Sequence, residues 1–431
     1  MRIALISYHY PPARAVGGFR AEKDAEALRA AGHDVHIIAA QVREAACPHL
    51  VTASGIVVKR VNAWPSPRQL WVRWRTRARR SGPPAAVTAS STAAPSTVPD
   101  WKRWIFSLLW LPDDLQGFIF PAYAAARRSH DGRGPDLVIT SAPPFSAHLA
   151  GLMLAASGVR WIAEFRDPWT DNPWKTAIHR SLFSDRVERW LEHETLRLAE
   201  RVVVASEGID RILRRKLPPR EQGRVLLVRN GIEALAPEVH VPRTAALQRI
   251  VHVGSCYGAR DPRPFVLGLA RVIQRHGLAP AQLQVQMVGK CREYAGGSIE
   301  ALVRDAGISA FVQFEDWLPH DACQRLVNEA DVLLLLAQQQ PDQVPNKLYD
   351  YLGSRRPILA FVDEDGESAR MLGEVGGHAL VTTGLPEDAA AGLELALGLT
   401  PQQRLSEPAA ARLEEWTTAA QMRRLVQALQ T

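Results

Sequence analysis

Residues 331–361 read DVLLLLAQQQPDQVPNKLYDYLGSRRPILAF. The stretch opens with an apolar run, Val332 to Leu336, a pattern typical of a strand buried on both faces. Two prolines prevent helix in the polar loop that follows, and helix is expected from Asn346. Residues 358–362 predict a second buried strand. This order of elements places the loop and the helix N-terminus at the carboxyl edge of a parallel sheet, where open α/β sheets bind ligands.

Two carboxylates of this stretch can hold two ends of one ligand. Asp342 lies on the predicted loop, and Asp350 lies about one turn into the predicted helix. The helix N-terminus between them favours a phosphate group. An ordinary polar loop and an amphipathic helix would explain the same spacing without a ligand.

The stretch also resembles the sugar-nucleotide site of retaining glycosyltransferases of family 4, which have the two-domain GT-B fold. The family signature is two acidic residues, usually Glu, separated by seven residues, whereas both are Asp here. The segment from Lys347, KLYDYLGSRRPIL, is similar to the bacterial form of that signature. The resemblance implies that Asp342 approaches the donor sugar and that Asp350 holds the ribose hydroxyls.

Composition sets outer limits on the class of protein. The 431 residues suffice for two domains, and 23% charged with 46% hydrophobic residues is typical of a globular protein. The formal charge of +7 fits a polyphosphate ligand, an anionic lipid or a nucleic acid. The four cysteines form no C-x-x-C pair, which argues against disulfides and structural zinc. We expect neither a metal nor a cofactor.

The sequence shows no secretion or membrane-spanning signal, which predicts a cytoplasmic protein. The apolar run at the N-terminus is too short for a signal peptide. No apolar stretch reaches the ~20 residues needed to cross a bilayer. The expected location is the cytoplasm, either free or attached to the inner face of the cell membrane.

The N-terminal residues predict a β-α-β unit with a glycine pair in its first loop. Residues 3–7 and 34–39 are the expected strands, and residues 20–31 the expected helix. Gly17 and Gly18 match neither dinucleotide nor Walker loops, but they resemble the N-terminal glycines of family 4. That resemblance implies that backbone amides approach the donor phosphate or the acceptor there. Arg20 either adds charge to this acceptor-side contact or is solvated.

Residues 64–111 form a basic, tryptophan-rich insert. Six of the twelve tryptophans fall within it, residues 68–80 carry six arginines and no acid, and residues 81–99 are of low complexity. Basic helices with Trp and Leu often lie in the membrane interface, so we expect contact with an anionic membrane surface. Helices that cap the N-terminal domain are the alternative. We do not expect a nucleic-acid partner.

A further group of charged residues follows the strand predicted at residues 159–165. Glu164, Arg166 and Asp167 belong to EFRDPW, which resembles one bacterial branch of family 4. We expect Glu164 and Asp167 to be catalytic and Arg166 to lie on the acceptor side. Buried ion pairing among these residues is the alternative. Residues 184–200 predict a solvated helix of mixed charge.

The second half of the chain predicts another β-α-β series. Residues 233–248 are the expected linker, and residues 249–400 a nucleotide-sugar-binding domain. Arg260 lies where family 4 carries phosphate-binding basic residues, so the resemblance implies a donor-binding role for Arg260 and Lys347. Residues 401–431 predict one C-terminal helix that packs back on the N-terminal domain.

The sequence therefore predicts an α/β protein of the GT-B fold, with two doubly wound Rossmann-like domains facing a central cleft. Residues 1–232 form the acceptor-side domain. The expected reaction is metal-independent transfer of a hexosyl group from a nucleotide diphosphate sugar to a saccharide or lipid-linked acceptor, with retention, in the synthesis of cell-surface polysaccharide or glycolipid. A GT-B epimerase acting on a nucleotide sugar and a non-catalytic GT-B partner protein are the alternatives.

Overall fold

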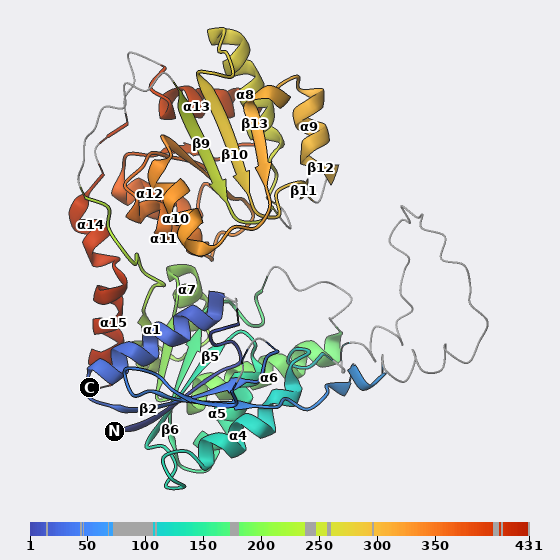
Figure 1. Ribbon diagram of the computed structural model, residues 1–431. Coiled ribbons are helices and arrows are strands. Elements are labelled where there is room, and N and C mark those ends of the chain that lie inside the picture. Colours follow the sequence, from blue (N-terminus) through green and yellow to red (C-terminus); the bar gives the residue numbers. More distant parts are fainter. Residues whose placement is uncertain are drawn as a thin grey trace. The chain divides into compact units, whose positions relative to one another are not determined.

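The computed structural model describes most of the chain. The described residues are 1–13, 16–43, 45, 47–67, 69–71, 107, 110–172, 181–237, 247–256, 260–294, 297–399, 405–406 and 408–429. They divide into two compact units (Figure 1). Unit 1 comprises Met1–Ala205, Ile209–Val228 and Arg424–Thr431, and unit 2 comprises Ser206–Gly208 and Arg229–Arg423. The domain boundaries expected from the sequence stay predictions.

Unit 1 is built on an eight-stranded sheet in the order β3-β4-β2-β1-β5-β6-β7-β8. All neighbouring strands are parallel except the pair β3 and β4. The strands are β1 (Arg2–Ser7), β2 (Asp34–Ala40), β3 (His49–Val51), β4 (Val57–Val61), β5 (Leu137–Ala142), β6 (Arg160–Phe165), β7 (Arg201–Val204) and β8 (Val225–Leu227). The helices are α1 (Val16–Ala30), α4 (Ile119–Arg127), α5 (Ser146–Ala156), α6 (Leu182–Leu198) and α7 (Glu207–Arg215), with short 3-10 turns η1 (Gln116–Phe118) and η3 (Pro219–Arg224).

Unit 2 is built on a six-stranded parallel sheet in the order β13-β10-β9-β14-β15-β16. Its strands are β9 (Gln248–Val253), β10 (Leu283–Val288), β13 (Val312–Glu315), β14 (Val332–Ala337), β15 (Ile358–Val362) and β16 (Ala379–Val381), with a small hairpin of β11 (Glu293–Tyr294) and β12 (Gly297–Ser298). The helices are α8 (Arg263–His276), α9 (Ile299–Asp305), α10 (His320–Glu329), α11 (Asn346–Gly353), α12 (Glu367–Val375), α13 (Pro386–Ala396) and α14 (Ala410–Glu415), with the 3-10 turn η4 (Ser309–Phe311). The last helix, α15 (Thr418–Gln427), begins in unit 2, and its residues from Arg424 onward belong to unit 1.

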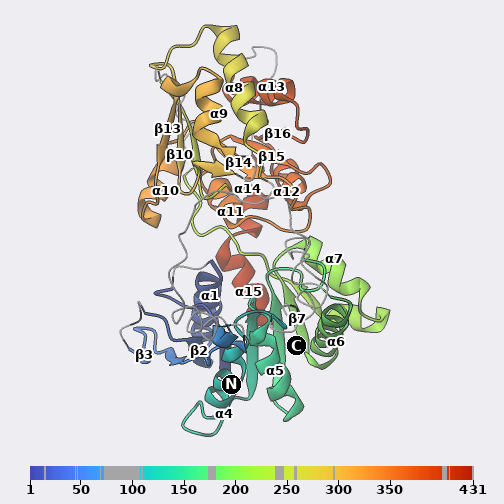
Figure 2. The same ribbon diagram turned by 90° about the vertical axis from the view of Figure 1, so that its right-hand side faces the viewer.

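Alternation along β14 joins two hydrophobic cores in unit 2. Leu334 and Leu336 pack into the core beneath α8, α9 and α13, whereas Leu333 and Leu335 pack into the core beneath α10, α11 and α12. All six residues of β14 are buried, because helices cover both faces of the sheet (Figure 2). The strand predicted from the apolar run is therefore confirmed, and it lies in the middle of the sheet.

The strand order places a topological switch point in each unit. Connections run in opposite directions from β1 and β5 in unit 1, and from β9 and β14 in unit 2. Ligands of doubly wound sheets bind in the crevice at the carboxyl ends of such neighbouring strands. The loops after these four strands are therefore the places to look for functional side chains.

The prediction of one C-terminal helix was wrong. The described part of residues 401–431 contains two short helices, α14 and α15, separated at Trp416 and Thr417. Ile232 forms a parallel bridge with Thr417, donates to the Trp416 carbonyl at 2.8 Å and accepts from the Thr418 amide at 2.8 Å. These backbone groups serve the bridge, so one continuous helix cannot use them.

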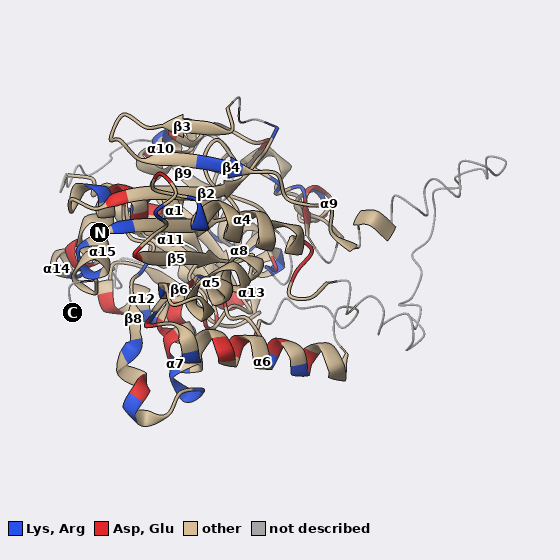
Figure 3. Ribbon diagram, turned by 90° about the horizontal axis from the view of Figure 1, so that it is seen from below, with Lys and Arg blue, Asp and Glu red and all other residues tan. Residues whose placement is uncertain are grey.

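The prediction of a solvated helix near residues 184–200 was wrong for one face of α6. This helix carries acidic and basic residues along its length (Figure 3). Glu188, Glu192 and Leu196 are nevertheless buried. Lys216 explains part of that burial, because its ammonium donates to Glu192 Oε2 at 2.6 Å. A charge pattern therefore did not identify the solvated face.

Two predicted segments lie largely outside the described residues. In the basic insert, residues 68, 72–106 and 108–109 are not described, and in the linker residues 238–246 are not described. Trp64 is the first residue of the insert and is 60% exposed. None of the helices in the described parts of the chain has the length and apolar character required to span a membrane.

Candidate functional site

The switch point of unit 2 brings Lys347 over the end of β9. Lys347 lies in the first turn of α11, and its Nζ lies 3.4 Å from His252 Nε2 on β9. Gly254 follows β9 with φ +124°, and a Cβ there would lie 3.3 Å from Lys347 Nζ. The glycine therefore leaves room for the lysine and supplies a backbone conformation that other residues rarely adopt.

Arg260 reaches the same loops from the segment that precedes α8. It is buried, donates to the Ser255 carbonyl at 3.2 Å and donates to Gln340 Oε1 at 3.3 Å. Gln340 belongs to the loop after β14, so Arg260 joins the loops that follow the two central strands. The charge of Arg260 acts on Lys347, so the two side chains belong to one neighbourhood, and their donor-binding role stays a prediction.

The charges around Lys347 and Arg260 favour the binding of an anion. Burial of the Lys347 ammonium, and secondly the charge of Arg260, lower the pKa of Lys347 from 10.5 to about 7. Among the residues the structure describes, no carboxylate forms an ion pair with Lys347. A diphosphate would supply the opposite charge that a desolvated lysine lacks.

The loop that carries Asp342 is fixed by a second carboxylate. Asp363, which follows β15, accepts from the Gln339 amide at 2.8 Å and from the Gln340 amide at 2.7 Å. Gln339 has φ +56°, an uncommon value for a residue other than glycine. Asp342 is partly buried three residues farther along the loop. The predicted contact of Asp342 with a donor sugar stays a prediction.

Asp350 lies in a polar pocket between α10 and α11. The pocket has a volume of about 240 Å³, and His320, Gln324 and Asn328 of α10 line it together with Asp350 of α11. Residues 233–236 and Ser354 complete the lining. A carboxylate, amides and an imidazole can all bond to hydroxyl groups, which suits the predicted ribose contact of Asp350.

In unit 1, Arg20 and Glu164 form a buried ion pair. Glu164 Oε1 accepts from Nε and Nη2 of Arg20, each at 2.9 Å, and Glu164 Oε2 accepts from the Ser141 hydroxyl. The exposed fractions are 3% for Arg20 and 2% for Glu164. Both oxygens of Glu164 accept from neighbours, because burial of two opposite charges requires such pairing. The predicted ligand or water contact of Arg20 and the predicted catalytic role of Glu164 stay predictions.

Asp24 joins this pair without a full negative charge. Its Oδ1 lies 3.2 Å from Arg20 Nε, one turn away on α1. Burial raises the pKa of Asp24 to about 8, although the charge of Arg20 opposes the shift and the charge of Glu164 adds to it. Burial also acts to raise the pKa of Glu164, but Arg20, Ser141 and Arg166 outweigh it and the net shift is downward. Glu164 therefore carries the charge and Asp24 the proton.

The position of the Arg166 guanidinium explains why a glycine is required at position 17. It donates to the Gly17 carbonyl and to the Ser141 hydroxyl, each at 3.0 Å, and to the Pro143 carbonyl. A Cβ on Gly17 would lie 2.4 Å from Arg166 Nη2, so a larger residue would displace the guanidinium. Gly18 packs against the Tyr10 backbone, where a Cβ would lie 3.2 Å away. Asp167 is partly buried and acts on Arg166 through its charge.

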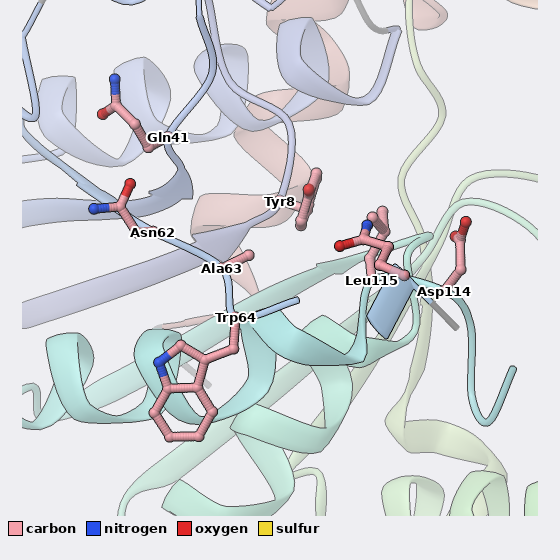
Figure 4. Close-up of a pocket in the computed structure, with 8 residues that line it drawn as sticks. Tyr8, Gln41, Asn62, Ala63, Trp64, Asp114 and Leu115 are labelled. Carbon is pink, nitrogen blue, oxygen red and sulfur yellow. The ribbon is translucent and has the colours of Figure 1, made fainter. Parts of the chain in front are cut away.

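Unit 1 also contains a pocket that sequence analysis missed. Its volume is about 210 Å³, and its lining comes from residues that follow β1, β2 and β4, from Gln69 and from the segment before η1 (Figure 4). The lining residues are Tyr8, Gln41, Asn62, Ala63, Trp64, Gln69, Asp114 and Leu115. Trp64 stacks on Phe120 with ring centroids 5.8 Å apart. The only sequence signal was the position of Tyr8, Gln41 and Asn62 directly after strands.

Comparison with known proteins identifies the family. Residues 17–231 match the glycosyl transferase 4-like domain. The chain belongs to the glycosyl transferase 4-like family. No match was found among curated protein sequences. The family prediction is confirmed, and the protein is a glycosyltransferase.

Solved structures with the same fold extend over the whole chain. Sucrose-phosphate synthase from Thermosynechococcus elongatus has a TM-score of 0.58 and 17% identity, over 99% of this chain and 96% of that chain. HepE of Anabaena in complex with UDP-glucose has a TM-score of 0.61 and 13% identity, over 100% and 99%. The lipopolysaccharide outer core galactosyltransferase WaaB has a TM-score of 0.58 and 15% identity, over 100% and 99%. These similarities confirm the predicted GT-B fold.

Proposed function

We propose that the protein transfers a hexosyl group from a uridine diphosphate sugar to a saccharide or lipid-linked acceptor, with retention of the anomeric configuration. The observation that carries the proposal is the pair of cationic side chains, Arg260 and Lys347, at the switch point of unit 2. The choice of uridine is supported by HepE, a protein of the same fold that was solved with UDP-glucose.

Different residues of unit 2 bind different parts of the proposed donor. Arg260 and Lys347 bind the diphosphate, the N-terminus of α11 faces the same phosphates, and Asp350 accepts from the ribose hydroxyls. During transfer the bond from the sugar C1 to the diphosphate oxygen breaks, and C1 bonds to the acceptor hydroxyl oxygen. The hydroxyl proton leaves with the diphosphate. The two cations stabilise the negative charge that develops on the leaving group.

The pocket of unit 1 suits part of a saccharide acceptor. Two amide side chains, a carboxylate and a tyrosine line it, and Trp64 offers an aromatic face at its edge. Such groups bond to sugar hydroxyls and pack against sugar rings. WaaB, named for its action on the lipopolysaccharide outer core, supports a saccharide acceptor that is itself part of a glycolipid. Synthesis of cell-surface polysaccharide or glycolipid follows as the proposed role.

Calorimetry with UDP and with uridine tests the donor site. Arg260→Ala and Lys347→Ala should each weaken UDP binding by about 1.5–3 kcal/mol, or about 10- to 150-fold, and leave uridine binding nearly unchanged. Arg263→Ala and Lys290→Ala are matched controls, because Arg263 is exposed and paired with Asp261, and Lys290 is exposed at the end of β10. Equal losses for UDP and uridine, or equal losses in the controls, would refute the assignment.

The proposed membrane attachment rests on residues 64–111. Six arginines within residues 68–80 contribute on the order of 1 kcal/mol each near acidic lipid, and that part fades with salt. The part of the binding free energy that comes from burying tryptophan side chains in the membrane does not weaken with salt. Binding to acidic vesicles should drop between low and high salt and leave a remainder that Trp101→Ala with Trp104→Ala removes. If the full chain ignores acidic vesicles at low salt, the insert has another role.

A further inference from the structure

Two cysteine sulfurs and one imidazole nitrogen meet in unit 2, close to the proposed donor site. The Sγ atoms of Cys256 and Cys291 and a ring nitrogen of His252 all lie within 4.8 Å of one another. His252 is on β9, Cys256 follows β9, and Cys291 follows β10. The exposed fractions are 0% for His252 and Cys291 and 6% for Cys256. The absence of a C-x-x-C pair hid this cluster, because the fold and not the local spacing assembles it.

Backbone hydrogen bonds hold the two cysteine loops side by side. The Gly254 amide donates to the Val288 carbonyl at 2.9 Å, and the Cys256 amide donates to the Lys290 carbonyl at 3.0 Å. Gly289 has φ +107°, and a Cβ there would lie 2.6 Å from the Gly254 carbonyl oxygen. The close approach of the loops is therefore built into the sheet edge, and it fixes the two thiols next to each other.

His252 is held in the tautomer that a metal ligand requires. Its Nδ1 lies 2.8 Å from the Leu334 carbonyl oxygen, which can only accept, so Nδ1 carries the proton. Nε2 then presents its lone pair, and it lies 3.4 Å from Lys347 Nζ. Histidine ligands of metal ions commonly donate their other ring N–H to a backbone carbonyl in this way.

We propose that His252, Cys256 and Cys291 form a binding site for Zn(II). Two sulfur ligands and one imidazole are a donor set that zinc prefers, and the fourth tetrahedral position is left for a water molecule or another small ligand. Binding forms two Zn–S bonds and one Zn–N bond and releases two protons, one from each thiol. Cys291 then gives up the hydrogen bond that its thiol donates to the Gly254 carbonyl at 2.8 Å.

The site is linked to the donor site through Lys347. The lone pair of His252 Nε2 that now faces Lys347 Nζ becomes a bond to the metal. The lysine loses that partner, so occupancy by zinc changes how Lys347 is held under the proposed diphosphate. The zinc site itself does not depend on the proposed donor, because its ligands and their geometry stand without it.

Titration of the reduced, metal-free full chain with Zn(II) and with Co(II) tests the proposal. We expect one Zn(II) per chain, and with Co(II) the near-ultraviolet charge-transfer band that marks thiolate ligation. Cys256→Ser and Cys291→Ser should each weaken binding by about 100-fold or more, since loss of an outer partner alone costs about 10- to 100-fold. Cys47→Ser with Cys323→Ser is the matched control and should bind as the unsubstituted protein does. Equal binding by all variants would overturn the proposal.

Alkylation of the unsubstituted protein provides a test that needs no variant. Because Cys256 and Cys291 are buried, the reaction is followed until a thiol reagent modifies both in the reduced, metal-free protein. Zn(II) should then slow their modification, while Cys47, which is exposed, should react at the same rate with and without zinc. Labelling is located by peptide mass. The proposal fails if zinc protects neither thiol, or if Cys256 and Cys291 form a disulfide in the isolated protein and take up no metal after reduction.

Discussion

Both units place positive side chains near the carboxyl ends of the strands of a parallel sheet. The surroundings of these charges differ between the units. In unit 1, Arg20 forms a buried ion pair with Glu164, and Ser141 occupies the other oxygen of that carboxylate. In unit 2, Lys347 faces His252 and a second cation, Arg260, and its pKa falls to about 7. A charge that is already paired inside the protein holds loops in place. A charge that is poorly compensated is the one that gains most from an anionic ligand.

The largest expected effect is the loss of the buried pair in unit 1. Glu164→Ala removes the main partner of the buried Arg20 guanidinium and leaves the Asp24 carboxyl beside it, so the free energy of unfolding should fall by up to about 3–5 kcal/mol. Arg20→Met combined with Glu164→Leu removes both charges and should cost less than the single change. Denaturant unfolding measures both. A loss of transfer activity in Glu164→Ala without a loss of stability would make Glu164 catalytic and break the comparison.

Asp24 should make stability depend on pH. Its pKa is about 8 in the folded protein and near 3.8 when unfolded, so the folded state holds the extra proton between these values. The contribution of Asp24 to the free energy of unfolding is therefore full below about pH 4 and is lost as the pH rises toward 8. Asp24→Asn should remove that slope. Identical slopes in both proteins would show that Asp24 is charged.

A smaller effect is expected at the pocket of unit 2. Asp350→Asn removes a charged acceptor from the proposed ribose contact and should weaken UDP and uridine binding alike, by about 1–3 kcal/mol. This pattern differs from that of Lys347→Ala, which should affect UDP alone. Asp321→Asn, an exposed residue of α10 beside the same pocket, is the control. Unchanged affinities in Asp350→Asn would remove Asp350 from the site.

Local sequence patterns predicted the buried strands of unit 2, but they did not predict features that leave no apolar signal or that depend on distant residues. β15 has the predicted bounds, and β14 extends one residue beyond the predicted run, because a short run of large apolar residues is typical of a strand covered on both faces. β3 was not predicted, since all three of its residues are exposed and leave no apolar signal. The break between α14 and α15 was also missed, because it depends on a bridge to the distant Ile232.

In the candidate site, too, single residues could be proposed from the sequence, whereas contacts between distant residues could not. Arg260, Lys347 and Asp350 were proposed from residues near strand ends and from the family resemblance. The partnership of Arg20 with Glu164 joins residues 144 positions apart, and Cys256 and Cys291 come together only through loops on neighbouring strands. The sequence shows which residues lie at the edge of a sheet. It does not show which of them pair with each other.

The location of UDP in a crystal structure of the complex tests the central claim most directly. We expect UDP to bind in unit 2, with diphosphate oxygens about 3 Å from Lys347 Nζ and the Arg260 guanidinium and with the ribose hydroxyls on Asp350. Arg20 and Glu164 should keep their ion pair and make no contact with the nucleotide. A diphosphate bound to Arg20 or Arg166, with Arg260 and Lys347 left without a phosphate, would contradict the account.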